Sequence, residues 1–174
     1  MRPKRLRRVV GAGLIVAGAT VSLPGAAAAT PADDLQAVRA VTARYHSFEQ
    51  SIKDGYSTVD EPCVTSPLGT MGIHAVSGAL VVDPRIDPLQ PEILLYVPDE
   101  NGAMRLVGVE YLVFDADGDL ATDDDRPTLF GQPFDGPMPG HTPTMPVHYD
   151  LHVWLWEDNP SGLFAPFNPS LSCP

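Results

Sequence analysis

The sequence predicts an α+β domain in which an N-terminal amphipathic helix packs on a curved, mainly antiparallel sheet. One segment, residues 31–53, repeats apolar side chains at three- and four-residue spacing, as a helix with one buried face does. The segments after it are apolar runs of strand length, and 19 prolines exclude long helices from the loops between them. One helix followed by several strands favours a helix layer on one face of an antiparallel sheet.

Residues 1–29 have the three parts of a secretory signal peptide. Five Lys and Arg lie in the first eight positions, an apolar stretch covers residues 9–21, and small residues occupy 25–29. The apolar stretch is short for a bilayer span of about 20 residues, and Pro24 interrupts the segment. We expect export by the general or the twin-arginine route, followed by cleavage. The product is a secreted or cell-envelope protein, residues 30–174, with a single domain and no stable membrane anchor.

The balance of charged residues predicts which partners the exported chain attracts. The net charge is −11, from 11 Lys and Arg against 22 Asp and Glu. Five of the basic residues and none of the acidic ones belong to the signal peptide, so cleavage lowers the net charge to about −16. Such a surface repels nucleic acid and attracts cations. A metal ion or a small molecule is therefore the expected partner, although the same charge also suits simple solubility.

The predicted helix begins after Thr30, because a hydroxyl caps the first turn and Pro31 fits the first helical position. Its apolar face consists of Leu35, Val38, Val41, Tyr45, Phe48 and Ile52. We expect it to end near Lys53, with Gly55 as the left-handed cap.

Five later segments have the composition of strands. They are residues 72–82, 92–97, 104–114, 128–130 and 147–156. Asn101-Gly102 is typical of a hairpin turn and predicts that the second and third of these pair with each other. Residues 131–146 form the longest irregular segment between strands, and loops of that length are often functional.

The two cysteines, Cys63 and Cys173, are expected to form a disulfide, since the chain is exported. The bond would attach the C-terminal tail to the segment after the helix. Closing so long a loop contributes on the order of 3–5 kcal/mol in the chain-entropy model. A pair of thiolate metal ligands is the alternative.

The segment 147–156 is the first candidate for a functional site. Side chains alternate between the faces of a strand, so one face carries His148, Asp150, His152, Trp154 and Trp156. The two histidines lie about 13 Å apart along a regular strand and cannot share one small ion. Asp150 can share an ion with either of them, and Trp154 can line a ligand site. Further ligands must come from elsewhere, and His74 and His141 are the predicted donors.

Glu110 is the second candidate, because it interrupts the apolar run 106–114. A buried carboxylate is costly unless it is paired, protonated or bound to a cation. The functional interpretation is a metal ligand or a general base. The alternatives are a solvent-facing side chain under a loop, or an ion pair with Arg105.

Two weaker patterns also suggest metals. Met138, His141 and Met145 share one loop, and thioether and imidazole groups suit copper, although methionines also fill gaps under loops. The acidic segment that follows residue 114 offers carboxylates at alternate positions, as a calcium loop does. Its predicted ligands are Asp115, Asp117 and Asp119. Leu120 stands where an EF-hand requires glycine, so a solvated acidic connection is the better interpretation.

Three segments, residues 63–74, 130–141 and 149–162, carry sequence motifs. They include FGQPFDGPMPGH and YDLHVWLW, the latter followed by NPSG. On these motifs the chain resembles a group of exported bacterial proteins of actinobacterial type. The resemblance covers nearly all of residues 30–174 and implies no particular activity.

Together these patterns predict a secreted domain that binds a transition metal, copper or zinc, or a small polar ligand through a His/Glu cluster. Enzymatic activity is left open, because no serine-hydrolase, phosphate-loop or zinc-protease motif is present in the sequence. One alternative is an acid–base enzyme that uses a His–Asp or His–Glu pair in a cone-shaped pocket. The other is a non-catalytic interaction protein of the cell envelope.

Overall fold

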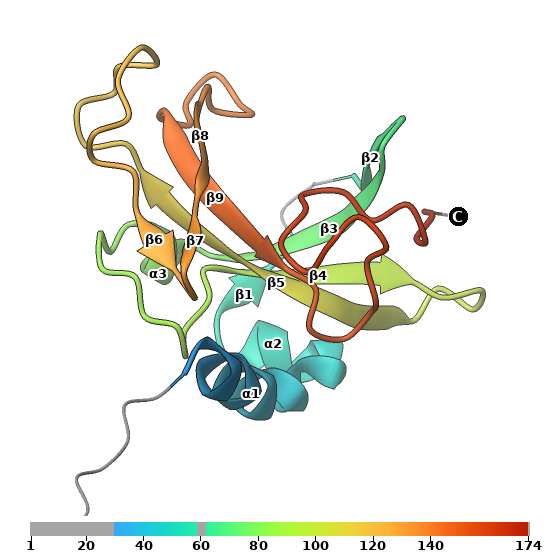
Figure 1. Cartoon of the computed structure of the whole chain (residues 1–174). Coiled ribbons are helices and arrows are strands. Elements are labelled where there is room, and N and C mark those ends of the chain that lie inside the picture. The colour runs from blue at the N-terminus through green and yellow to red at the C-terminus, as the bar shows by residue number, and fades with distance from the viewer. Residues whose placement is uncertain (1–29, 59–61, 174) are drawn as a thin grey trace, which may run out of the picture.

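The computed structural model describes residues 30–58 and 62–173, and in this part seven strands form one antiparallel sheet (Figure 1). With the two strands of a separate hairpin, the described residues contain nine strands: β1 (Tyr56–Ser57), β2 (Val64–Ser66), β3 (Gly69–Ser77), β4 (Ile93–Pro98), β5 (Met104–Phe114), β6 (Thr128–Leu129), β7 (Gln132–Pro133), β8 (Asp135–Met138) and β9 (His148–Val153). Their order in the sheet is β1-β3-β4-β5-β9-β8, with β2 paired to β3, while β6 and β7 form a separate hairpin. The α+β prediction is confirmed in this coarse form, although the sheet is not strongly curled.

The predicted helix begins as expected but is not continuous. Thr30 accepts a hydrogen bond from the Asp33 backbone N–H (3.3 Å), and the Asp33 carboxylate accepts one from the Thr30 N–H (3.0 Å). The helical segments are α1 (Pro31–Thr42), the 3-10 turn η1 (Ala43–His46) and α2 (Phe48–Lys53). The Tyr45 carbonyl accepts a hydrogen bond from the Tyr96 hydroxyl at 2.7 Å, and Ser47 is extended before α2. At the point where the helix breaks, the Tyr45 carbonyl is therefore bonded to a side chain of the sheet.

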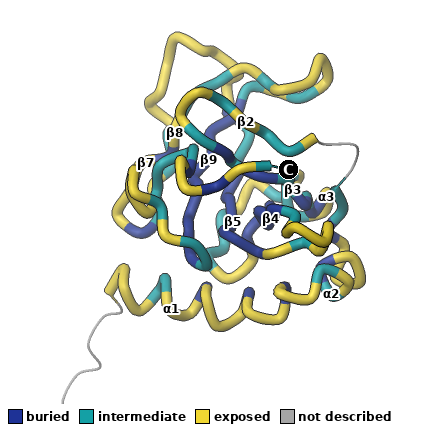
Figure 2. Tube along the Cα trace, turned by 90° about the vertical axis from the view of Figure 1, so that its right-hand side faces the viewer, coloured by how far each residue is buried: buried dark blue, intermediate teal, exposed yellow. Residues whose placement is uncertain are grey.

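The sheet has two buried faces. Helices α1 and α2 cover one face, and Figure 2 shows the buried strands between α1 and the loops on the other side. The core on the helix side is rich in tyrosine and includes Val38, Tyr45, Leu94, Tyr96, Tyr111 and Tyr149. We call the opposite face the loop face. Its smaller apolar cluster includes Ile93, Leu95, Val107, Leu112, Trp154 and Leu171.

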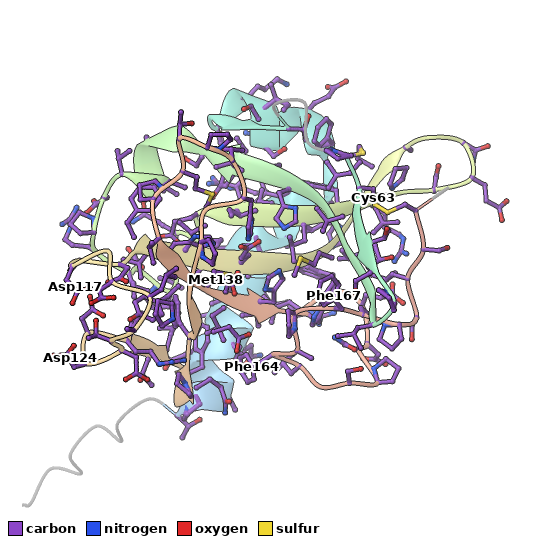
Figure 3. The ribbon with its side chains drawn as sticks, turned by 90° about the horizontal axis from the view of Figure 1, so that it is seen from above. Cys63, Asp117, Asp124, Met138, Phe164 and Phe167 are labelled. Atoms are coloured by element: carbon purple, nitrogen blue, oxygen red, sulfur yellow. A yellow bond between two sulfur atoms is a disulfide. The ribbon has the colours of Figure 1, made fainter. Side chains whose placement is uncertain are left out.

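A disulfide and a pair of backbone hydrogen bonds help to attach the C-terminal segment to the loop face. Cys63 and Cys173 form the predicted disulfide, with 6.1 Å between their Cα atoms (Figure 3). Thr70 and Asn168 exchange two backbone hydrogen bonds of 3.0 Å. Gly69 permits this approach, because a Cβ there would lie 2.5 Å from the Asn168 carbonyl carbon.

Most predicted strands are present with adjusted ends. The strand expected at 72–82 ends at Ser77, where the short helix α3 (Gly78–Val81) begins. The Asn101-Gly102 hairpin joins β4 to β5 as predicted, with the Gly102 N–H donating to the Asp99 carbonyl at 2.9 Å. The predicted signal peptide lies outside the described residues. No helix in the ranges that the structure describes is long and apolar enough to cross a membrane.

Candidate metal centre

The register of four neighbouring strands brings three chemically active side chains to one place on the loop face. Glu110 of β5 lies directly across from His152 of β9 and, on its other side, from Ile93 of β4. Ile93 in turn lies across from Val76 of β3. His74 is two residues from Val76 and therefore shares its face. His74, Glu110 and His152 thus converge although they are far apart in the sequence.

The distances in this cluster suit a single small ion. Glu110 Oε2 lies 3.1 Å from His74 Nε2 and 3.6 Å from His152 Nε2. One ligand atom from each residue lies within 4.8 Å of the other two. Ligands at tetrahedral zinc are about 3.4 Å apart, given bonds of about 2.1 Å. The cluster therefore has nearly the spacing that such an ion requires.

The cluster is buried, and many of its polar atoms lack hydrogen bonds. The side chains of His74, Glu110 and His152 are 14%, 3% and 1% exposed. Five polar atoms here have no hydrogen-bond partner among the described residues: His74 Nδ1, Glu110 Oε2, Asp150 Oδ1, and His152 Nδ1 and Nε2. Buried polar atoms in proteins are normally paired. Such a concentration of unpaired atoms is typical of a site built for a ligand.

The charges within the cluster control its protonation. Burial raises the pKa of Glu110, but the charges of His152 and His74 outweigh this effect and lower that pKa to about 2. Burial lowers the pKa of His152, and the negative charges of Glu110 and Asp150 more than compensate, so the pKa of His152 is raised. Glu110 is thus a carboxylate at neutral pH, which is the form that binds a cation.

Asp150 lies behind one of the histidines. Its Oδ1 atom is 3.7 Å from His152 Nδ1, the ring nitrogen that faces away from Glu110. Metal-binding histidines commonly direct their second ring nitrogen to a carboxylate, which orients the ring and makes it a stronger ligand. Asp150 occupies the place of such a carboxylate, although 3.7 Å is longer than a hydrogen bond.

The cluster lines a cavity of about 540 Å³ on the loop face. Figure 3 views the molecule from this side, with the helices behind the sheet and Phe167 of the C-terminal segment labelled. Apart from His74, Glu110, Asp150 and His152, most of the wall is apolar, including Val76, Val81, Ile93, Leu112, Phe114 and Phe167. No sequence pattern predicts this wall, and only the expected disulfide places the C-terminal segment near it.

The other predicted ligands lie near the cluster but do not join it. His141 lines the cavity, and its ring stands edge-on to that of His148 with centroids 4.9 Å apart. His148 is buried and lies outside the cavity lining, and burial lowers its pKa. Met145 also lines the cavity, where its Sδ accepts a hydrogen bond from the His141 N–H (3.4 Å). Met138 lies across from His148 on β8.

The two tryptophans occupy opposite faces. Trp154 is buried among the loop-face apolar residues, and its indole N–H donates to the Ala165 carbonyl at 2.6 Å, outside the cavity lining. The expectation that Trp156 shares this face is wrong. Because β9 ends at Val153, Trp156 turns to the helix side, where the Arg39 guanidinium lies 4.4 Å from its ring centroid.

The remaining sequence alternatives find other partners. Arg105 forms its ion pair with Glu157 and not with Glu110. In the acidic loop, Asp115 and Asp117 accept hydrogen bonds from backbone N–H groups two residues ahead. Within the described residues, only His74, Glu110 and His152 form a metal-compatible group of three. Calcium binding by Asp115, Asp117 and Asp119 stays a prediction.

No protein-family model matches the chain, and searches of curated proteins and of solved structures find no significant match. The resemblance to exported bacterial proteins therefore stays a prediction. Any function must be argued from the site itself.

Proposed function

We propose that the protein binds one divalent transition-metal ion, zinc, through His74, Glu110 and His152. The observation that carries the proposal is the convergence of these three buried side chains, from three strands, within 4.8 Å. A face needed only for packing would not concentrate so many unpaired polar atoms. Positive charge from a bound ion would satisfy the Glu110 carboxylate and both imidazoles together.

The donor set supports zinc over copper. Two imidazoles and one carboxylate with a fourth position open are typical of zinc sites that bind an exchangeable ligand. The group of three offers imidazole and carboxylate ligands but no thiolate, since both cysteines form the Cys63–Cys173 disulfide. Cupric ion binds most nitrogen and oxygen sites more tightly than zinc, so the experiment must compare the two.

A secreted or cell-envelope location is part of the proposal. The Cys63–Cys173 disulfide is typical of proteins in oxidising compartments. The excess of acidic residues also favours the binding of cations from the surrounding medium.

An acid–base enzyme is the second candidate, because Asp150 and His152 form a close carboxylate–imidazole pair beside a cavity. Glu110 itself is poorly suited to be the base. A general base works best with a pKa near the working pH, and the pKa of Glu110 is lowered to about 2. This mismatch favours the metal proposal.

Metal content tests the proposal directly. Untagged protein, purified without chelator and analysed by mass spectrometry of the elements, should contain about one equivalent of zinc per chain. Adding zinc at 100 times its dissociation constant to chelator-treated protein should stabilise the fold by about 2.7 kcal/mol. Less than a tenth of an equivalent of zinc or copper, together with unchanged melting on metal addition, contradicts the proposal.

Matched variants locate the site. Each of His74→Gln, Glu110→Gln and His152→Gln should weaken zinc binding by more than the roughly 10- to 100-fold typical of an outer partner, the loss expected for Asp150→Asn. His46→Gln and Glu49→Gln are the controls. His46 packs against Trp156 on the helix side, and Glu49 is exposed on α2. Equal zinc affinity in the His152→Gln and His46→Gln proteins would rule out this site.

A further inference from the structure

The proposed metal centre lies in the wall of a largely apolar, half-open cavity, and this position indicates what else can bind there. His74, Glu110 and His152 all belong to the cavity lining. Three protein ligands leave the fourth position of a tetrahedral ion open. That position faces the cavity, because the strands β3, β5 and β9 occupy the other side of the cluster. A molecule in the cavity can therefore bind the ion directly.

The walls fit an uncharged, apolar body. Val76, Ile93, Leu112 and Phe114 form the part of the lining that lies on the sheet. Val81 of α3 and Phe167 of the C-terminal segment form part of the remaining wall. A volume of about 540 Å³ lies within the roughly 300–1,000 Å³ that small-molecule sites occupy. Apolar surface of this kind adds affinity for each methylene that it covers.

The charges of the lining limit the ligand to a single polar head group. Within the described residues, the lining contains the carboxylates of Glu110 and Asp150 but neither lysine nor arginine. A second anionic group on the ligand would be buried without a positive partner, which is costly. Thr142 and Thr144 are the only hydroxyl-bearing residues of the described lining.

We propose that the cavity binds a small apolar molecule with one metal-binding head group, such as a medium-chain monocarboxylate, whose head occupies the open position of the ion. This inference rests on the metal proposal above. The apolar wall supplies the affinity, and the ion fixes the orientation of the ligand.

Cobalt-loaded protein provides the test, because the visible absorption of cobalt reports both metal binding and a change of its ligands. Titration with acetate, butanoate and hexanoate should give dissociation constants that fall about fourfold for each added methylene. Hexanoate, with four more methylenes than acetate, should then bind about 250-fold more tightly. Adipate, with the same six carbons and a second carboxylate, should bind at least tenfold more weakly than hexanoate.

Two neighbouring residues supply the matched variants. Val81→Trp should fill the cavity, leave the cobalt spectrum intact and remove the preference for hexanoate over acetate. Val82→Trp is the control, since Val82 is 71% exposed and lies outside the cavity lining. A normal cobalt spectrum with equal affinities for acetate and hexanoate overturns this inference alone. The absence of a protein-bound cobalt spectrum overturns it together with the metal proposal. Equal hexanoate binding by the Val81→Trp and Val82→Trp proteins places the ligand outside this cavity.

Discussion

Two buried glutamates, Glu110 in the candidate metal centre and Glu92 beside β4, have the same exposure but opposite pKa shifts. Each is 2% exposed. The charges of His152 and His74 overcome burial at Glu110 and lower its pKa to about 2. Burial dominates at Glu92 and raises its pKa to about 7, despite a hydrogen bond of 3.2 Å from the Leu112 N–H. Basic neighbours, and not burial, separate the two carboxylates.

The contrast shows what marks a site in this molecule. Glu92 lies near enough to Tyr56 and Tyr111 to raise the pKa of both, with no metal-compatible cluster among the described residues around it. Glu110 lies between two imidazoles in the wall of a cavity. A perturbed pKa alone would have selected both residues. Convergence with other ligand atoms selects only Glu110.

The largest effect is expected when Glu110 loses its charge in the metal-free protein. Glu110→Gln should lower the free energy of unfolding at pH 7 by about 3 kcal/mol, because it leaves His152 buried without its anionic partner. The folded pKa of Glu110 lies below its unfolded value, so the stabilisation is lost as the pH falls from 4.5 towards 2. Because the pKa of His152 is raised by the same pair, the stabilisation is also lost as the pH rises through the folded pKa of His152. Urea denaturation in the presence of a chelator measures the difference.

Glu49→Gln is the matched control for this measurement, since Glu49 is exposed on α2, and should change stability by less than about 0.5 kcal/mol. A metal-free Glu110→Gln protein that is more stable than the native protein contradicts the prediction. In that case Glu110 is a destabilising group retained for metal binding alone.

Glu92→Gln should raise the free energy of unfolding at alkaline pH, whereas Glu110→Gln should lower it. The folded pKa of Glu92 lies above its unfolded value, so proton binding stabilises the fold fully below pH 4.5, and this stabilisation is lost as the pH rises through 7. Glu92→Gln keeps a neutral acceptor for the Leu112 N–H and avoids the buried charge. It should therefore be about 2 kcal/mol more stable than the native protein at pH 8 and nearly equal to it at pH 4.

Urea denaturation of the native and Glu92→Gln proteins at both pH values tests this sign. Glu100→Gln, in the exposed turn between β4 and β5, is the control and should show no such pH dependence. An equal loss of stability at pH 4 and pH 8 would mean that the hydrogen bond to Leu112, and not the charge, decides the role of Glu92.

Local patterns in the sequence were enough to predict the class of fold and part of the site. The apolar run around Glu110 predicted a strand with one anomalous carboxylate, and alternation placed Asp150 and His152 on one face. His74 and His141 are the predicted donors because they come from another strand and from the long loop, and His74 alone joins the group of three. The partnership of these residues depends on strand order and register, which the sequence does not reveal.

Long-range contacts explain the errors. The helix breaks where the Tyr45 carbonyl binds the hydroxyl of Tyr96, which lies 51 residues further along the chain. Strict alternation along β5 would place Leu106 on the same face as Glu110. Leu106 instead belongs to the helix-side core, because a bulge where Leu95 and Tyr96 pair with β5 shifts the register. The cavity wall joins α3, the sheet and the C-terminal segment, so no single stretch of sequence predicts it.

The smallest stability change is expected for Tyr56→Phe, a variant that tests whether the Glu92 region is independent of the proposed metal centre. The Tyr56 hydroxyl donates to the Pro91 carbonyl at 2.8 Å, next to Glu92. Tyr56→Phe removes this buried hydrogen bond and should lower the free energy of unfolding by about 1 kcal/mol. Tyr111→Phe is the matched comparison, because that hydroxyl donates to the Pro88 carbonyl at 2.6 Å and should have a similar effect.

Neither tyrosine lines the cavity, so cobalt affinity should stay within about twofold of the native value in both variants. A tenfold loss of cobalt affinity in Tyr56→Phe would show instead that the two carboxylates are coupled. The strand pair that connects them, in which Ile93 of β4 lies across from Glu110, would then transmit the change. If cobalt affinity is unchanged and the free energy of unfolding falls by about 1 kcal/mol, Glu92 and its neighbours contribute to the stability of the fold and not to metal binding on the loop face.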